Sequence, residues 1–184
     1  LEGSDISVLL EKAAKIIGRE YKADTALVEE TDYMSRYCAH LRDMIKKGVN
    51  AKNYDKPLDG FKIIVDAGNG VGGFYATDVL EPLGANVEGS QFLDPDGMFP
   101  NHIPNPENAE AMDSVSKATV NSHADLGIIF DTDVDRAGCV DSVGEEINRN
   151  RLVALASYIA MEGHDSGVTV TDSVTSDGLK EYIE

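Results

Sequence analysis

Three aspartates at alternate positions, Asp131, Asp133 and Asp135, are the residues of this chain best placed to do chemistry. They follow directly after the apolar run 126–130, and Arg136 comes immediately behind them. Carboxylates this close together repel one another and raise each other's pKa unless a cation neutralises them. A compact cluster of oxygen ligands suits a hard divalent cation such as Mg²⁺, and a guanidinium suits phosphate. The segment therefore predicts a site for a metal ion and a phosphate group.

The spacing of these aspartates requires a bend. In a straight strand residues i and i+4 lie roughly 13 Å apart, whereas the ligands of one Mg²⁺ lie about 2.1 Å from the ion. The chain after Phe130 must therefore curl, and we expect Gly138 just downstream to help it do so. Ligands of open α/β sheets bind at the carboxyl ends of the strands, which makes the end of this run a favourable place for such a site.

Two other kinds of site also have aspartates at alternate positions. A calcium-binding EF-hand loop would need glycine in place of Arg136 and glutamate in place of Ser142, so the sequence excludes it. An aspartyl phosphatase would use Asp131 as the nucleophile and Asp133 as the acid/base. Asp135 stands where such enzymes usually have threonine or valine, which disfavours this alternative but leaves it open.

The segment Gly68–Gly73 matches the pattern G-x-G-x-x-G between an expected strand and an expected helix. With Glu88 about 20 residues further on, it could bind a dinucleotide as a Rossmann-like module. The same glycines suit a tight turn that needs positive φ angles and close packing. We favour the turn, because the aspartate cluster indicates different chemistry, and we keep nicotinamide-cofactor binding as an alternative.

A loop rich in proline and asparagine, Asp94–Pro106, follows the second expected strand. Its thirteen residues include four prolines, which fix φ and remove hydrogen-bond donors. The loop should have a rigid course, either as a functional loop or as a structural wrap around the sheet edge. His102 has no partner pattern around it, and we interpret it as structural or solvent-facing.

Composition narrows the classes of function. The chain has 184 residues and a net charge of −17, so we expect neither nucleic acid nor a membrane as partner. No stretch approaches the ~20 apolar residues of a membrane span, and the run Leu152–Met161 predicts a buried helix. Cys38 and Cys139 make no disulfide framework, and no signal peptide is recognisable, which favours a reduced, cytoplasmic location.

Hydrophobic periodicity predicts two amphipathic helices at the start of the chain. The first covers Ile6–Ile17 after an N-cap at Ser4, and the second covers Met34–Ile45 before a stop at Gly48. The polar segment Asn50–Gly60 then reads as a linker.

The next part alternates strands with helices, which predicts a three-layer α/β/α fold with a mostly parallel sheet. The expected strands are 61–65, 87–92 and 126–130, and the expected helices are 75–83 and 107–122. Short strands at 139–140 and around Ile147 should flank a turn at Gly144. A helix over 152–162, a strand over 168–171 and a helix over 176–183 would begin another α/β unit.

Five motifs in a fixed order resemble the α-D-phosphohexomutase family, the phosphoglucomutases and phosphomannomutases. They are Val65–Gly70, Phe99–His102, Pro104–Asn108, the aspartate segment Asp131–Arg136, and Thr171–Ser176. Together they cover roughly residues 56 to 184, and Leu1–Ile6 is more weakly similar to the end of the family's first domain.

The resemblance implies a four-domain enzyme that acts on a hexose phosphate. A phosphoserine donates its phosphoryl group to the sugar, and the bisphosphorylated sugar returns its other phosphoryl group to the serine. On the matching positions, Asp131, Asp133 and Asp135 would ligate Mg²⁺, and Arg136 would be catalytic by stabilising phosphate charge.

The same resemblance divides the chain among three domains. Residues 1–55 would be the helical end of the first domain with a linker, residues 56–142 the second α/β domain with the metal loop, and residues 143–184 the incomplete start of the third. The family's serine loop, sugar loop and phosphate loop are not found in this sequence, and Val174 stands where some relatives carry a lysine. We therefore expect a piece of a longer enzyme that does not turn over substrate alone. Sugar preference and oligomeric state are not readable from these residues.

Overall fold

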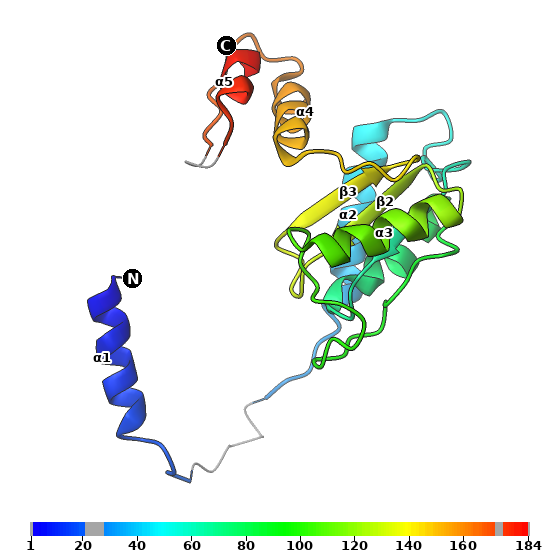
Figure 1. Ribbon diagram of the computed structural model, residues 1–184. Coiled ribbons are helices and arrows are strands. Elements are labelled where there is room, and N and C mark those ends of the chain that lie inside the picture. Colours follow the sequence, from blue (N-terminus) through cyan, green and yellow to red (C-terminus); the bar gives the residue numbers. More distant parts are fainter. Residues whose placement is uncertain (1, 21–27, 172–174, 184) are drawn as a thin grey trace. The chain divides into compact units, whose positions relative to one another are not determined.

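The computed structural model describes residues 2–20, 28–171 and 175–183 (Figure 1). The chain divides into two compact units, residues 1–33 and residues 34–184, and we describe each by itself. This division falls ahead of the boundary that we expected at residue 55. The assignment of either unit to a domain of a longer enzyme stays a prediction.

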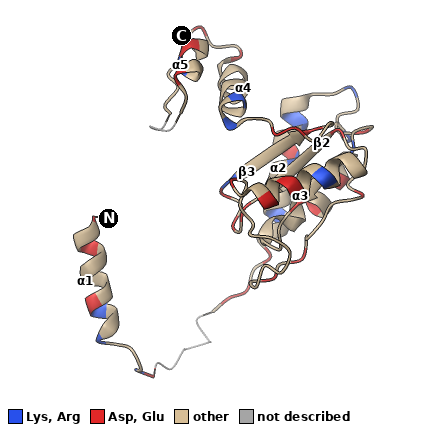
Figure 2. Cartoon of the chain, in the orientation of Figure 1, with Lys and Arg blue, Asp and Glu red and all other residues tan. Residues whose placement is uncertain are grey.

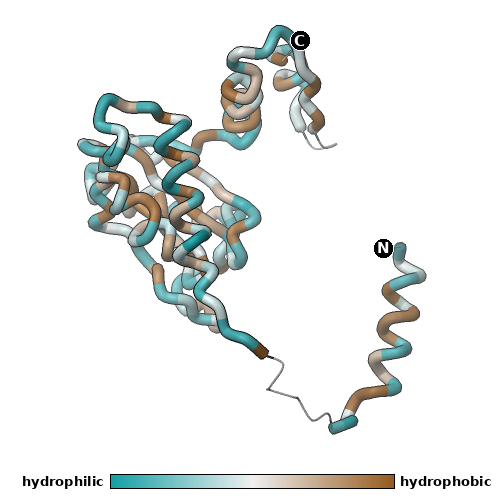
Figure 3. The backbone as a smooth tube through the Cα atoms, turned by 180° about the vertical axis from the view of Figure 1, so that it is seen from behind, coloured by the Kyte–Doolittle hydropathy of each residue, from teal (hydrophilic) through white to brown (hydrophobic). Residues whose placement is uncertain are grey.

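The first unit contains one described helix, α1 (Gly3–Ala14), with no buried residue. Apolar residues recur along it, as the hydropathy colouring of Figure 3 shows, yet Leu10 is 65% exposed. The predicted N-cap at Ser4 was wrong. The N-cap is Glu2, two residues earlier, because the backbone N–H of Glu2 donates to the carboxylate of Asp5 at 2.9 Å and closes the first turn there.

A sheet of three strands forms the centre of the second unit, in the order β1 (Ile63–Asp66), β2 (Leu126–Phe130) and β3 (Ala137–Asp141). Strands β1 and β2 are parallel, and β2 and β3 are antiparallel. Residues 86–91 extend the sheet beyond β1 only through isolated parallel bridges, so the predicted strand 87–92 was wrong. A turn at Gly89, with φ +104°, interrupts it, and the N–H of Val65 donates to the Ser90 hydroxyl instead of to a backbone carbonyl.

Helices cover both faces of this sheet, which gives the predicted three-layer α/β/α fold (Figure 1). On one face α3 (Ala109–Asn121) packs against Ile129 and Val140. On the other face a π-helix, η3 (Tyr75–Leu80), packs against residues that alternate with those, such as Val65 and Phe130. Helix α2 (Met34–Val49) in turn covers η3.

The helical segment after β1 differs from the single helix that we predicted. It consists of the 3₁₀ turn η2 (Val71–Gly73), the π-helix η3 and the 3₁₀ turn η4 (Glu81–Leu83). The predicted stop of α2 at Gly48 was also displaced. The helix continues to Val49, and Asn50 ends it with φ +45°, a left-handed conformation that asparagine tolerates.

Two helices follow the sheet, α4 (Arg149–Met161) and α5 (Asp177–Ile183). The prediction that α4 is a buried helix was wrong, since it has no buried residue and Tyr158 is 67% exposed. Residues 168–171 form no strand, and residues 172–174, including Val174, lie outside the described part of the chain. Within that part, no helix combines the length and apolar character that crossing a bilayer demands.

The predicted turn at Gly144 is present, with φ +83° at that glycine. It returns the chain along β3, where the N–H of Ile147 donates to the carbonyl of Cys139 at 2.9 Å. The second predicted strand at Ile147 is reduced to one antiparallel bridge, between Val140 and Glu146.

Candidate metal and phosphate site

The three aspartates lie together in the loop that joins β2 to β3. This loop, residues 131–136, which we call the metal loop, reverses the chain, and ligand atoms of Asp131, Asp133 and Asp135 lie within 4.8 Å of one another. The predicted curl is therefore present, although Gly138 does not form it. Gly138 lies inside β3, and the bend occurs at Val134, whose φ is +66°. A β-branched residue in this conformation is strained, as residues of functional loops often are.

Asp131 is the buried member of the cluster, with 1% exposure. The backbone N–H of Arg136 donates to its Oδ1 at 3.1 Å, and Nε of Arg136 donates to its Oδ2 at 2.9 Å. Nε of Arg136 also lies 3.5 Å from Oδ1 of Asp135. Asp133 and Asp135 are exposed, so the cluster opens to solvent on one side.

Electrostatic coupling makes the three carboxylates unequal. Burial by itself raises the pKa of Asp131, but hydrogen bonds with Arg136 and Asp135 and the charge of Arg136 together lower it. The hydrogen bond with Asp131, followed by the charges of Asp131 and Asp133, raises the pKa of Asp135. The bond to Asp131 also raises the pKa of the Arg136 guanidinium. Arg136 thus lies against two of the three carboxylates, Asp131 and Asp135, and a cation would relieve the remaining repulsion.

The donor set fits a hard divalent cation. Adjacent and opposite oxygens around octahedral Mg²⁺ are about 3 to 4 Å apart, so only a small contraction of the cluster is needed. Arg136 donates one hydrogen bond to each oxygen of Asp131, and each oxygen has a second lone pair that a metal could use in place of the contact with Asp135. Exposure of Asp133 and Asp135 lets water complete the coordination.

The same contacts disfavour the aspartyl phosphatase alternative. A nucleophilic carboxylate must present a free oxygen to its substrate, whereas Asp131 is almost fully buried and both its oxygens are held by Arg136. Phosphorylation of Asp131 would therefore require the metal loop to open.

A second buried carboxylate ends the neighbouring strand. Asp66, with 0% exposure, is the last residue of β1. Asp66 and Asp131 are the buried acidic residues of the described chain, and the others lie on helices, in loops and at the end of β3 (Figure 2). Nε2 of His102 lies 3.0 Å and 3.1 Å from its two oxygens, and Gln91 and Ser114 donate to Oδ2.

This network identifies His102 as a structural residue, one of the two roles that the sequence suggested. Its partners could not be found from sequence, because Asp66 and His102 are 36 positions apart. The one local signal for this network in the sequence is Asp66 itself, a polar residue at the end of a buried apolar strand.

The glycine turn after β1 is filled by protein atoms. A Cβ added to Gly68 would lie 2.7 Å from Cβ of Pro104, and one added to Gly70 would lie 2.9 Å from the carbonyl oxygen of Thr132. The N–H of Val71, at the start of the following 3₁₀ turn, donates to that same oxygen. These contacts favour the tight turn over a pyrophosphate site, which needs free N–H groups at a helix N-terminus.

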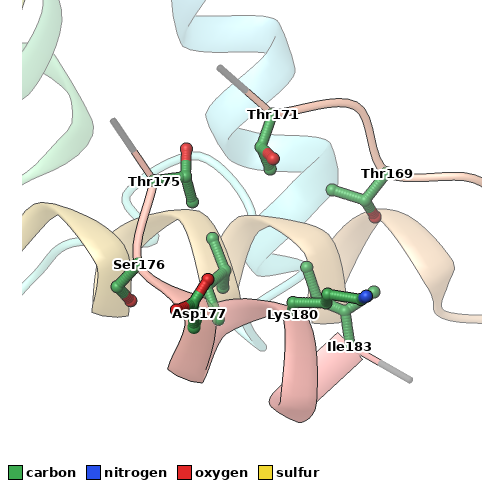
Figure 4. A pocket seen from close by; sticks show the side chains of 8 residues that line it. Thr169, Thr171, Thr175, Ser176, Asp177, Lys180 and Ile183 are labelled. Atoms are coloured by element: carbon green, nitrogen blue, oxygen red, sulfur yellow. The ribbon is translucent and has the colours of Figure 1, made fainter. Parts of the chain in front are cut away.

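A cavity of about 390 Å³ lies against α5, away from the metal loop in sequence (Figure 4). It is lined mainly by polar side chains, namely Thr169, Thr171, Thr175, Ser176, Asp177 and Lys180, with Leu179 and Ile183. Figure 4 shows that these come from α5 and from the segments before it. None of the predicted metal ligands lines this cavity.

A family model described as phosphoglucomutase/phosphomannomutase, alpha/beta/alpha domain II, matches residues 35–144. The chain belongs to the phosphoglucomutase/phosphomannomutase family. The matched residues of this family member contain the whole sheet, the helices that cover it and the metal loop.

Named relatives agree with this assignment. The chain is 34% identical to a phosphomannomutase/phosphoglucomutase of Pseudomonas aeruginosa over 84% of its own length and 30% of that protein. It is 32% identical to a phosphoglucomutase of Neisseria meningitidis over 85% of its length and 32% of that protein. A crystal structure of a family protein from Burkholderia thailandensis superposes with a TM-score of 0.65 and 27% identity, covering 88% of this chain and 32% of the other. The chain thus spans about a third of the length of these relatives.

Proposed function

We propose that this chain carries the metal-binding part of an enzyme that interconverts hexose 1-phosphate and hexose 6-phosphate. The observation behind the proposal is the convergence of Asp131, Asp133 and Asp135 within 4.8 Å, at the carboxyl end of β2, with Arg136 against them. Membership of the phosphoglucomutase/phosphomannomutase family supplies the reaction class. The cytoplasmic location stays a prediction.

In this proposal the three aspartates hold Mg²⁺. When bound, the cation would draw negative charge from the phosphoryl group during its transfer. Asp131 is pre-positioned by Arg136 and supplies the fixed ligand, while the exposed Asp133 and Asp135 close on the ion.

Arg136 has two roles in the proposal. Its Nε holds Asp131, and its side chain is 50% exposed, so other N–H groups of the guanidinium can reach a phosphate at the mouth of the site. The phosphoserine that exchanges its phosphoryl group with the 1- and 6-oxygens of the sugar would come from another part of a longer chain.

Metal binding can be tested by thermal unfolding. A ligand that binds only the folded state stabilises it by about 2.7 kcal/mol at a hundredfold excess over Kd, and so raises the melting temperature. We expect MgCl₂ to raise the melting temperature of the chain, and Asp133→Ala to remove most of that rise.

The matched control for this experiment is Asp165→Ala, which removes an exposed aspartate outside the metal loop. It should respond to MgCl₂ as the unaltered chain does. Equal responses of the Asp133 and Asp165 variants would mean that Mg²⁺ acts through non-specific interaction with the acidic surface of the chain, and the proposed site would be wrong.

The chain alone should not turn over substrate. It carries the proposed metal ligands but not a serine loop of the family's type, so we expect no conversion of glucose 1-phosphate or mannose 1-phosphate to the 6-phosphate. A coupled assay with a catalytic amount of the sugar bisphosphate measures this. Turnover by this chain that disappears in Arg136→Ala would show that the chain is active by itself, and would contradict the proposal that it supplies only the metal-binding part.

A further inference from the structure

Arg136 is held at more than one point. Besides the bonds of its Nε and backbone N–H to Asp131, its Nη1 donates to Oδ1 of Asn105 at 3.3 Å. Two partners on different atoms of the planar guanidinium fix the orientation of its plane, which a single ion pair does not. Asn105 therefore decides which way the remaining N–H groups face.

Asn105 is itself a fixed acceptor. The N–H of Glu107 donates to the same Oδ1 at 2.9 Å, which closes an Asx turn, and the N–H of Asn108 donates to the carbonyl of Asn105 at 2.9 Å. Pro104 and Pro106 on either side remove backbone freedom. Local hydrogen bonds thus fix the position of the Asn105 amide oxygen independently of Arg136.

The loop around Asn105 is anchored to the domain at three places. His102 binds the buried carboxylate of Asp66, at the end of β1. Pro106 packs beside Gly138 of β3, since a Cβ added there would lie 3.1 Å from that of Pro106. Asn108 caps α3 by accepting from the N–H groups of Glu110 and Ala111. The position of the amide is therefore coupled to both outer strands and to the covering helix.

We propose that Asn105 is the positioning residue for Arg136, and that the loop 102–108 supports the metal loop from outside it. The consequence for phosphate binding rests on the proposed function, whereas the orientation of the guanidinium does not. Asn105 contacts neither the aspartates nor a reacting atom, so its effect passes through Arg136.

The experiment follows rotation of the Arg136 guanidinium about its Cζ–Nε bond, measured from exchange between the Nη1 and Nη2 signals in ¹⁵N spectra of the full chain. Arg136→Lys assigns the signals. Asn105→Ser keeps the local turn, because a serine hydroxyl accepts from the N–H two residues on, but it is too short to reach Arg136. Asn105→Asp keeps both acceptor functions.

We expect slow rotation in the unaltered chain, rotation about three- to tenfold faster in Asn105→Ser, and slow rotation again in Asn105→Asp. Averaged signals in the unaltered chain would overturn the proposal without any variant, as would equal rates in Asn105→Ser and the unaltered chain, or fast rotation in Asn105→Asp. An unchanged melting temperature in Asn105→Ser alongside faster rotation separates positioning from a structural role. Faster rotation in Asn105→Ser than in the unaltered chain, in a chain that fails to bind Mg²⁺, would support the role of Asn105 and reject the proposed function.

Discussion

Two buried carboxylates in equivalent places have different partners. Asp66 and Asp131 follow the apolar residues of adjacent parallel strands, and both are almost fully buried. Asp66 is enclosed by histidine, glutamine and serine side chains and by the N–H of Gly68. Asp131 is held by one arginine beside two exposed carboxylates. Asp66 has protein donors around both its oxygens, which indicates a structural role. The carboxylates around Asp131 outnumber the cations, which favours a bound cation there.

The Asp66 network should contribute strongly to stability. Asp66→Ala leaves His102, Gln91, Ser114 and the N–H of Gly68 without their acceptor. Each buried donor left without its acceptor costs about 1 to 3 kcal/mol and Asp66→Ala leaves several, whereas loss of a single neutral hydrogen bond costs about 1 kcal/mol. We expect urea unfolding to show a much larger loss of free energy in Asp66→Ala than in Ser114→Ala. Equal losses would contradict the role of Asp66 as the shared acceptor of this network.

Among the elements, those built on a continuous local signal could be predicted from sequence. Strand β2 begins and ends at the predicted residues, because the apolar run 126–130 lies between polar residues at both ends. Helices α2 and α3 follow from their spacing of apolar residues. The convergence of the three aspartates was also predicted, because their chemistry requires it.

Elements that depend on contacts distant in sequence could not be predicted. The segment after Gly89 fails as a strand because a serine hydroxyl takes the place of a ladder carbonyl. The loop bends at the strained Val134 without the expected help of Gly138, since the antiparallel pairing of β3 keeps that glycine inside a strand. The contact of Asn105 with Arg136 joins residues 31 positions apart, and no local pattern encodes it.

Tyr75, the first residue of η3, lies between two phenylalanine rings, and its ionisation should be visible in a pH titration. The rings of Tyr75 and Phe130 are stacked with centroids 4.7 Å apart, and Phe74 lies 4.5 Å from Tyr75. Burial, and then the hydrogen bond with Tyr37, raise the pKa of Tyr75 to about 12. The folded chain thus binds this proton more tightly than the unfolded chain, whose tyrosines ionise near pH 10.

The sign of the effect follows from linkage. Stability from the raised pKa is complete below about pH 10 and is lost as the pH rises towards about 12. We expect the absorbance of tyrosinate at 295 nm to show a late component that Tyr75→Phe removes, and this variant to lose less stability in that range. Tyr54→Phe, at a tyrosine that is 45% exposed, is the control and should leave the late component in place. A late component that survives in Tyr75→Phe would contradict the assignment.

At the scale of the whole chain, exposed apolar residues are concentrated outside the central fold. Helices α1 and α4 bury no residue, yet carry exposed side chains such as Leu9, Leu10, Leu155 and Ile159. The part from α2 to β3, in contrast, encloses three clusters of buried apolar residues. This distribution agrees with the residues matched by the family model, 35–144. The central fold therefore contains the residues that determine stability.

Two deletions test where this fold begins. Removal of residues 1–33 takes away no buried described residue, so the free energy of unfolding should change by less than about 0.5 kcal/mol. Removal of residues 1–55, at the boundary expected from sequence, also removes α2 and with it Cys38, which packs on Val79 and Leu83. Each large apolar side chain left exposed costs about 1.5 to 3 kcal/mol, so this second deletion should lower stability severely or prevent folding. Equal stability of the two shortened chains in urea would mean that α2 belongs with the preceding segment and that the fold starts after residue 55.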